Sequence, residues 1–242
     1  MATLERLEPA DLRAVLVAYR DALRAHQEAL NRLNVYPVPD GDTGTNMALT
    51  VESVLGELEG TEPELASVCK AIAHGALMGA RGNSGVILSQ ILRGLTSTFS
   101  SAEVVDGPTV ARALVAASEG AYQAVGRPVE GTILTVVREA SEAGTEAAGQ
   151  AGATLAGVLE AARAGASSAL ERTPELLEVL RRAGVVDAGG SGFLLLLDAA
   201  LCVVADRPVP EPPAPTGEGP AGEARAGGAS GAAEPAPGSP EG

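Results

Sequence analysis

The 242-residue chain contains a single lysine and few aromatic residues. The lysine, Lys70, lies in an apolar stretch between Cys69 and Ala71. A Walker A phosphate loop requires a lysine between a glycine and a serine or threonine, so this chain does not contain one. Any phosphate site in the protein must therefore rely on metal ions, arginines or backbone amides.

Positive charge is scarce in general, because 17 basic residues face 31 acidic residues and the formal net charge is −14. Such a surface repels nucleic acids and anionic membranes, so we expect no nucleic acid partner. The two cysteines, Cys69 and Cys202, lie in apolar helical contexts typical of buried free thiols. With no signal sequence and no run of about 18 apolar residues recognised, we expect a cytoplasmic protein without a membrane span.

The shortage of aromatic residues, at 2% of the chain, also leaves almost no strand signal. Alanine-rich and leucine-rich stretches repeat at intervals of three and four residues instead, which predicts an all-α fold. The first helix is predicted from Pro9 to Leu33. His26 falls on its apolar face, so we expect a packed histidine there rather than a catalytic one.

Glycines and prolines divide the rest of the chain into further helices, eight or nine in all. We expect them at 45–58, at 62–77, from the turn 79–85 to 99, at 108–125, from the turn 126–132 to about 144, at 154–172, at 174–182 and at 191–205.

The last part of the sequence has a different composition. Residues 208–242 are mostly proline, glycine, alanine, glutamate and serine, with Val209 as the only large aliphatic residue. Such a segment buries too little surface to offset its ordering entropy. The sequence therefore predicts a folded domain at 1–206 and a disordered linker or tail at 207–242.

A candidate metal site lies in the loop that reads N-V-Y-P-V-P-D-G-D-T-G-T-N-M at 34–47. Asp40 and Asp42 can direct both carboxylates to one side of a tight turn, and Asn34 is near enough to add an oxygen. Hard cations such as Mg²⁺ prefer oxygen clusters of this kind. An EF-hand beginning at Asp40 is excluded, because the loop lacks the glycine and the glutamate that this motif requires. Turn formation and helix capping by the two aspartates remain an alternative.

Three further glycine-rich turns each open a predicted helix: G-A-R-G-N-S-G at 79–85, E-G-T-I at 130–133 and D-A-G-G-S-G at 187–192. Their backbone N–H groups and helix dipoles suit a phosphate, although each turn alone could be a plain helix cap. Alternate helices of an antiparallel series begin at the same pole, so these turns and the helix start after the carboxylate loop should converge.

In this order, the four motifs resemble the nucleotide-binding domain of dihydroxyacetone kinases. The fuller string at 34–47 is closer still to the N-terminal kinase domain of bacterial fatty acid kinase, and the resemblance covers about residues 5–206. It implies a barrel of eight antiparallel helices, with ATP or ADP and two Mg²⁺ ions at one pole.

The resemblance also implies roles for individual residues. Asn34, Asp40 and Asp42 match the metal ligands. The dihydroxyacetone kinase pattern has a third aspartate at slightly different spacing, and Asn34 stands in its place here. Nucleotide contacts are implied for Thr43, Gly44, Thr45, Asn46, Asn83, Ser84, Thr132, Ile133, Asp187, Ala188 and Gly189. Ile133 would pack against the base. Arg81 is the one basic residue that we add as a catalytic candidate, and no general base is identified.

The function implied is transfer of phosphate from ATP to a fatty-acid carboxylate that a separate fatty-acid-binding protein presents. A dihydroxyacetone kinase subunit is an alternative, weakened by the V-Y-P-V-P insertion and by Asn34. A regulatory module that holds ADP without turnover is another. A homodimer is compatible with all three functions.

Overall fold

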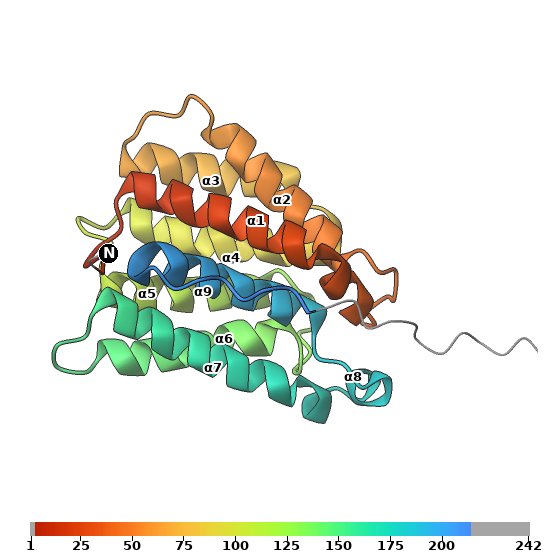
Figure 1. Ribbon diagram of the computed structural model, residues 1–242. Coiled ribbons are helices and arrows are strands. Elements are labelled where there is room, and N and C mark those ends of the chain that lie inside the picture. Colours follow the sequence, from red (N-terminus) through yellow and green to blue (C-terminus); the bar gives the residue numbers. More distant parts are fainter. Residues whose placement is uncertain (1–2, 214–242) are drawn as a thin grey trace, which may run out of the picture.

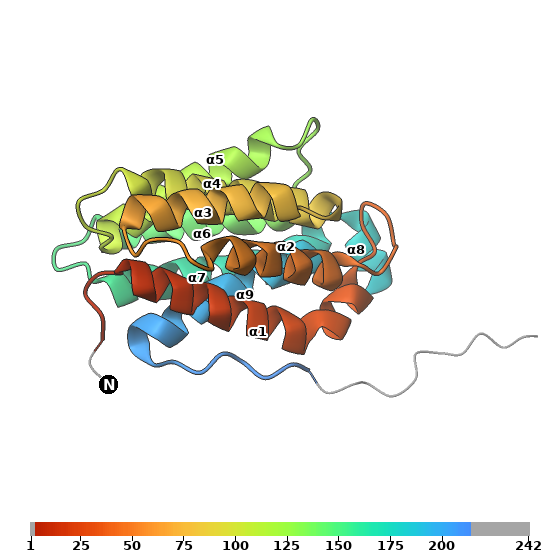
Figure 2. The ribbon, with the colours of Figure 1, turned by 90° about the horizontal axis from the view of Figure 1, so that it is seen from above.

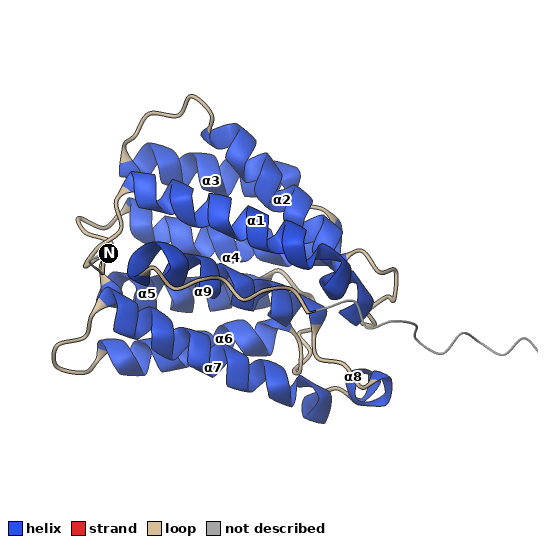
Figure 3. Ribbon diagram, in the orientation of Figure 1, coloured by secondary structure: helices blue, strands red, loops and turns tan. Residues whose placement is uncertain are grey.

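Residues 3–213 are described by the computed structural model, and within them it has nine α-helices and no strand (Figures 1 and 3). The helices are α1 (Pro9–Leu33), α2 (Thr43–Leu58), α3 (Leu65–Gly79), α4 (Gly82–Ser100), α5 (Gly107–Gln123), α6 (Ile133–Ala148), α7 (Leu155–Leu176), α8 (Glu178–Ala183) and α9 (Ala188–Ala205). The predicted all-α class is confirmed.

The helices form a closed series of neighbours. From α1 to α7 each helix packs against the next, α7 packs against α9, and α9 returns to pack against α1. Only the short α8, which follows α7, stands outside this series. The connections alternate between the two ends of the molecule, as Figures 1 and 2 show, so every second long helix begins at the same end.

The first helix shows how sequence periodicity becomes packing. It spans Pro9–Leu33, as predicted, and its apolar face buries Tyr19 and Leu23 completely. The Tyr19 hydroxyl donates a hydrogen bond to the carbonyl of Gly192 at 3.1 Å, which ties α1 to α9. His26 is 9% exposed and its Nε2 donates to the carbonyl of Pro210 at 3.0 Å. The expected structural role of this histidine is confirmed.

That hydrogen bond belongs to a short segment whose placement the composition did not predict. After α9 the chain runs back along the helix in an extended form (Figure 1), and Val209 packs against the core. The segment 207–213 contacts the helices through Val209, the Pro210 carbonyl and the Arg207 N–H, which donates to the Leu201 carbonyl at 3.4 Å. The expectation had rested on the average composition of a longer stretch. The remainder of the predicted tail, 214–242, lies outside the described residues.

The end of α7 also differs from expectation. The sequence predicted that this helix stops at Arg172 and that another begins at Pro174, but α7 continues through the proline to Leu176. Proline has no N–H to donate to the carbonyl four residues earlier. Here the hydroxyl of Thr173 donates to the carbonyl of Leu170 at 2.7 Å. The acceptor is therefore satisfied, and the helix passes the proline.

Helix α9 is long and apolar enough to cross a membrane by length and composition, which the sequence analysis did not recognise. However, 67% of its 18 residues are buried inside the described fold. It contacts α1, α2, α6 and α7 and carries Asp198, whose carboxylate pairs with Arg163 at 2.6 Å. These contacts are those of a core helix.

The Arg163–Asp198 ion pair gives a test of this packing. Asp198 is 3% exposed, so replacing Arg163 by methionine leaves a buried carboxylate without its cation. We expect R163M to lower the free energy of unfolding by about 3 kcal/mol in urea titrations. The matched control is R172M on the same helix, which removes an exposed ion pair with Glu139 and should cost less than about 1 kcal/mol. Equal effects of the two substitutions would contradict this account.

Candidate functional site

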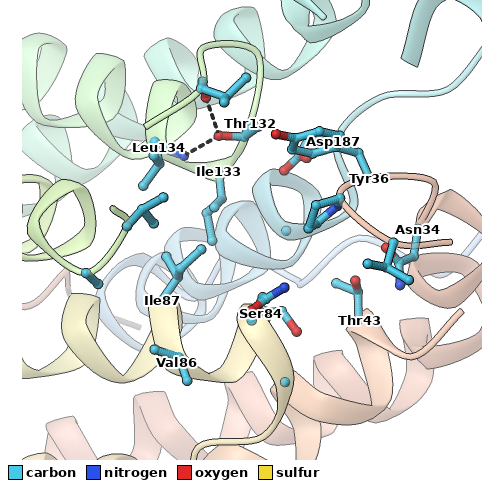
Figure 4. A pocket seen from close by; sticks show the side chains of 18 of the residues that line it. Asn34, Tyr36, Thr43, Ser84, Val86, Ile87, Thr132, Ile133, Leu134 and Asp187 are labelled. Carbon is cyan, nitrogen blue, oxygen red and sulfur yellow. Dashed lines mark hydrogen bonds between the residues drawn. The ribbon is translucent and has the colours of Figure 1, made fainter. Parts of the chain in front are cut away.

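A pocket of about 490 Å³ opens at the end of the molecule where α2, α4, α6 and α9 begin. Its walls include the carboxylate loop and residues from the starts of all four helices, as Figure 4 shows in part. The predicted convergence of the four turns is therefore confirmed. The connection between α5 and α6 supplies a further wall.

One end of the pocket is polar and carries the three predicted metal ligands, Asn34, Asp40 and Asp42. The Asn34 amide donates a hydrogen bond to Asp40 Oδ1 at 2.6 Å. Within residues 3–213 neither aspartate pairs with a basic side chain. Two carboxylates without a countercharge, next to an amide that also carries an oxygen, fit a hard divalent cation.

The described residues contain no group of three or more His, Cys, Asp or Glu side chains arranged to hold a metal ion. This is compatible with the predicted ligands, because the third of them is an asparagine. Mg²⁺ is commonly held by one or two carboxylates and completes its coordination with water and phosphate oxygens. The protein side chains would thus supply only part of the coordination.

The capping of α2 tests the alternative that the aspartates of the carboxylate loop serve only as turn and helix-capping residues. Asp42 occupies the N-cap position of α2, but its side chain makes no capping hydrogen bond. Asn31 of α1 does so instead, because its Oδ1 accepts from the backbone N–H groups of Gly44 at 2.8 Å and Thr45 at 3.2 Å. Helix capping therefore does not occupy the Asp42 carboxylate.

The predicted nucleotide-contacting residues of α2 divide into two groups. Thr43 lines the pocket, whereas Gly44, Thr45 and Asn46 do not. Gly44 and Thr45 face Asn31, and Asn46 is buried beside Gly82, where a Cβ atom would lie only 2.3 Å from the Asn46 amide nitrogen. Gly44 and Thr45 thus connect α2 to α1, Asn46 packs closely against the α3–α4 connection, and none of the three contributes to the pocket wall.

The start of α4 is the only one of the four helix starts around the pocket that no side chain caps. Gly82, Asn83 and Ser84 line the pocket, and α4 has no side-chain cap. The first N–H groups of a helix need partners, and an anion can supply them. Arg81, our catalytic candidate, does not line the pocket. Its guanidinium is exposed and donates to the carbonyls of Met78 at 3.4 Å and Ala80 at 3.1 Å.

The start of α6 is capped by its own threonine. Thr132 Oγ1 accepts from the Leu134 N–H at 3.4 Å and donates to the carbonyl of Val129 at 2.8 Å, as the dashed lines in Figure 4 show. Thr132 and Ile133 both line the pocket, as predicted.

The start of α9 is capped by Asp187, whose Oδ2 accepts from the Gly190 N–H at 2.7 Å. Burial raises the pKa of Asp187 to about 6, although hydrogen bonds from the backbone amides of Gly190, Ile133 and Gly189 favour the ionised form. Asp187 and Gly189 line the pocket, whereas Ala188 does not. The Asp187 carboxyl group thus joins the starts of α6 and α9.

The other end of the pocket is mostly apolar, with Arg127 as the one basic residue among its described lining residues, and the sequence motifs did not indicate most of it. Figure 4 shows Val86, Ile87, Ile133 and Leu134 on the side away from Asn34 and Thr43. The missed lining residues are Tyr36, Pro37, Val38, Gly82, Val86, Ile87, Ala124, Val125, Gly126, Arg127, Val129 and Leu134. Helical spacing from Asn83 or Ser84 could have indicated Ile87, because residues three and four apart share a face. The α5–α6 connection has no such periodic signal.

The raised pKa of Asp187 predicts a pH dependence of stability. Because its pKa is higher in the fold than in the unfolded chain, this group stabilises the fold fully below about pH 4, and the contribution is lost as pH rises through about 6. D187N keeps an oxygen acceptor but cannot ionise. Between pH 4 and pH 7 we expect wild type to lose up to roughly 3 kcal/mol of unfolding free energy relative to D187N. Denaturant titrations that give a constant difference over this range would contradict the assignment.

Known proteins resemble this chain over most of its length. The model of the DAK2 domain family matches residues 37–202. Protein YloV of Bacillus subtilis is 41% identical over 198 residues, which are 81% of this chain and 36% of that protein. An uncharacterized protein of Staphylococcus aureus is 44% identical over 180 residues, 74% of this chain and 33% of its own length.

The chain therefore spans about a third of the length of these curated relatives. The match from 37 to 202 includes Asp40, Asp42 and all four helix starts around the pocket. It extends over more than half of the chain and agrees with the predicted dihydroxyacetone kinase type of nucleotide-binding domain. The chain belongs to the DAK2 domain family.

Proposed function

We propose that this chain is an ATP-dependent kinase domain that transfers phosphate at a site with two Mg²⁺ ions. The observation that carries the proposal is the division of the pocket into two ends. At the polar end, the carboxylates of Asp40 and Asp42, which pair with no basic side chain of the described residues, lie near the uncapped start of α4. Mostly aliphatic side chains line the other end. A nucleotide has the same division, with charged phosphates at one end and a flat, largely apolar base at the other.

At the polar end, Asp40, Asp42 and Asn34 would hold the metal ions. Bound Mg²⁺ would supply the positive charge that phosphoryl transfer requires around the phosphate oxygens, because Arg127 is the only basic residue among the described residues that line the pocket. The backbone amides of Asn83 and Ser84 would orient the phosphates. At the apolar end Ile133 would pack against the base.

The phosphoryl acceptor that we propose is a fatty-acid carboxylate presented by a separate binding protein. A nucleotide would take up most of a 490 Å³ pocket, so the acceptor has to approach from outside. Large apolar side chains are exposed at the same end of the molecule, among them Leu77 (58%) and Met78 (62%) at the end of α3 and Leu176 (49%) at the end of α7. Exposed apolar groups of this kind favour a protein partner.

In this reaction a carboxylate oxygen of the fatty acid would attack the γ-phosphorus of ATP. The bond between the γ-phosphorus and the bridging oxygen would break, and ADP would leave with that oxygen. The product would be an acyl phosphate. A dihydroxyacetone kinase subunit is the second candidate, favoured by the family match itself, and it would use the same pocket with a hydroxyl acceptor.

The metal site can be tested by nucleotide binding. We expect D40N and D42N each to weaken ADP binding in the presence of Mg²⁺ roughly 10- to 100-fold, because each removes a negatively charged ligand. Isothermal titration calorimetry with and without EDTA measures this effect. D21N is the matched control, since Asp21 is an exposed α1 residue paired with Arg20, and its binding should equal that of wild type. Binding that survives both substitutions and ignores EDTA would contradict the two-metal site.

The acceptor can be tested by product formation. We expect the protein, mixed with Mg²⁺, ATP and a fatty-acid-loaded binding protein, to yield an acyl phosphate that hydroxylamine traps as a hydroxamate. D42N serves as the inactive control. Phosphorylation of dihydroxyacetone on its own binding subunit would identify the second candidate instead. Tight ADP binding without turnover on either acceptor would identify a regulatory module.

A further inference from the structure

The α5–α6 connection is the one wall of the pocket that is neither a helix start nor part of the carboxylate loop. Its residues 124–127 and Val129 line the pocket beside the aliphatic side chains of α4 and α6. The N–H groups of Ala124 and Val125 still donate to α5, to the carbonyls of Gly120 at 3.1 Å and Tyr122 at 3.3 Å, but the segment beyond Val125 is irregular and lies outside the helix. The contacts that fix this wall therefore bear directly on the apolar end of the pocket.

One carboxylate connects both ends of this segment. Glu130 Oε1 accepts a hydrogen bond from the Tyr122 hydroxyl at 2.8 Å, and Tyr122 lies in the last turn of α5. Glu130 Oε2 accepts from Thr135 Oγ1 at 2.7 Å and from Arg138 at 3.3 Å, and both of these residues lie in α6. The pocket-lining part of the connection is thus held between Tyr122 and Glu130.

The backbone after Glu130 is fixed as well. The Gly131 N–H donates to Thr135 Oγ1 at 2.8 Å, so Thr135 bonds both to the carboxylate and to the next amide. Gly131 has φ +83°, and a Cβ atom there would lie 2.9 Å from the Cβ atoms of Leu176 and Leu177. The chain is therefore held close to the end of α7 in a conformation that glycine adopts easily.

The charge state of Glu130 suits this role. Partial burial alone would raise its pKa, but hydrogen bonds from Thr135, Tyr122 and Arg138 outweigh burial and lower the pKa below its ordinary value. The side chain is therefore an ionised acceptor at neutral pH. The Glu130 side chain is 51% exposed and is not part of the pocket lining, so any effect on a ligand must pass through the connection.

We propose that Glu130 is a positioning residue that holds the α5–α6 connection as the base-side wall of the nucleotide pocket. This inference rests on the proposed function, because it requires a nucleotide whose base occupies the apolar end. Glu130 then contributes to affinity for the base and ribose part of the ligand, and it leaves the binding of the phosphates unchanged.

The test compares a ligand that has a base with one that has only phosphates. We expect E130A to weaken binding of Mg²⁺–ADP about tenfold in calorimetry, because the wall loses its charge-assisted hydrogen bonds. Binding of Mg²⁺–pyrophosphate should stay within about twofold of wild type, since it uses the polar end alone. Y122F removes a single hydroxyl and should weaken ADP binding by a smaller factor in the same direction. It serves as the milder variant should E130A unfold.

The matched control is E142A. Glu142 accepts from Arg138 at 3.0 Å on the side away from the connection, so its removal perturbs the same arginine and leaves the wall in place. We expect E142A to bind both ligands as wild type does. In a phosphotransfer assay, E130A should raise the KM for ATP with little change in kcat, because no group that touches the reacting atoms is altered.

Two results would overturn the inference alone: an equal loss of ADP and pyrophosphate binding in E130A and Y122F, or no loss of ADP binding in either variant. Wild-type protein that binds pyrophosphate and fails to bind ADP would overturn the proposed function as well.

Discussion

The arrangement of this site depends on one electrostatic constraint. The chain is acidic and has a single lysine, and Arg127 is the only basic residue among the described residues that line the pocket, so phosphates there depend mainly on helix amides and on cations bound to carboxylates. A single helix start offers few amides, and several must meet at one place. The closed series of helices supplies this, because every second long helix begins at the same end. Fold and site are thus linked through the direction of the helices.

The four helix starts differ in how far the protein itself satisfies them. Asn31 of the neighbouring helix α1 caps α2, whereas α6 and α9 are capped by their own N-cap residues, Thr132 and Asp187. Only α4 has no side-chain cap among these four, and its first turn lies along the pocket. The caps fix the shape of the pocket, and the uncapped start leaves amides for a ligand. Capping by Asp187 requires a buried carboxyl group between α6 and α9, and this burial raises its pKa and so disfavours its ionised form.

Periodic features of the sequence were predictable, and irregular ones were not. The spacing of apolar residues predicted α1 from about Pro9 to Leu33, where it is found, and the glycine-rich turns located the polar end of the pocket. Where α7 passes Pro174, the Thr173 hydroxyl satisfies the Leu170 carbonyl, a contact that no propensity scale includes. At the α5–α6 wall, Glu130 accepts hydrogen bonds from side chains of two helices. Such contacts are tertiary, so local sequence patterns do not contain them.

The separation of the two ends of the pocket has a consequence for the family to which this chain belongs. Under the proposed function, metal ions and phosphates use the carboxylate loop and the α4 start, while the base uses α6 and the α5–α6 connection. The exposed side chains of Leu77 and Met78 lie in the last turn of α3, just before the connection that leads into α4. A partner bound there would deliver its acceptor next to the phosphates and away from the base. Different acceptors could then be served by changes in this exposed surface, with the nucleotide site kept the same.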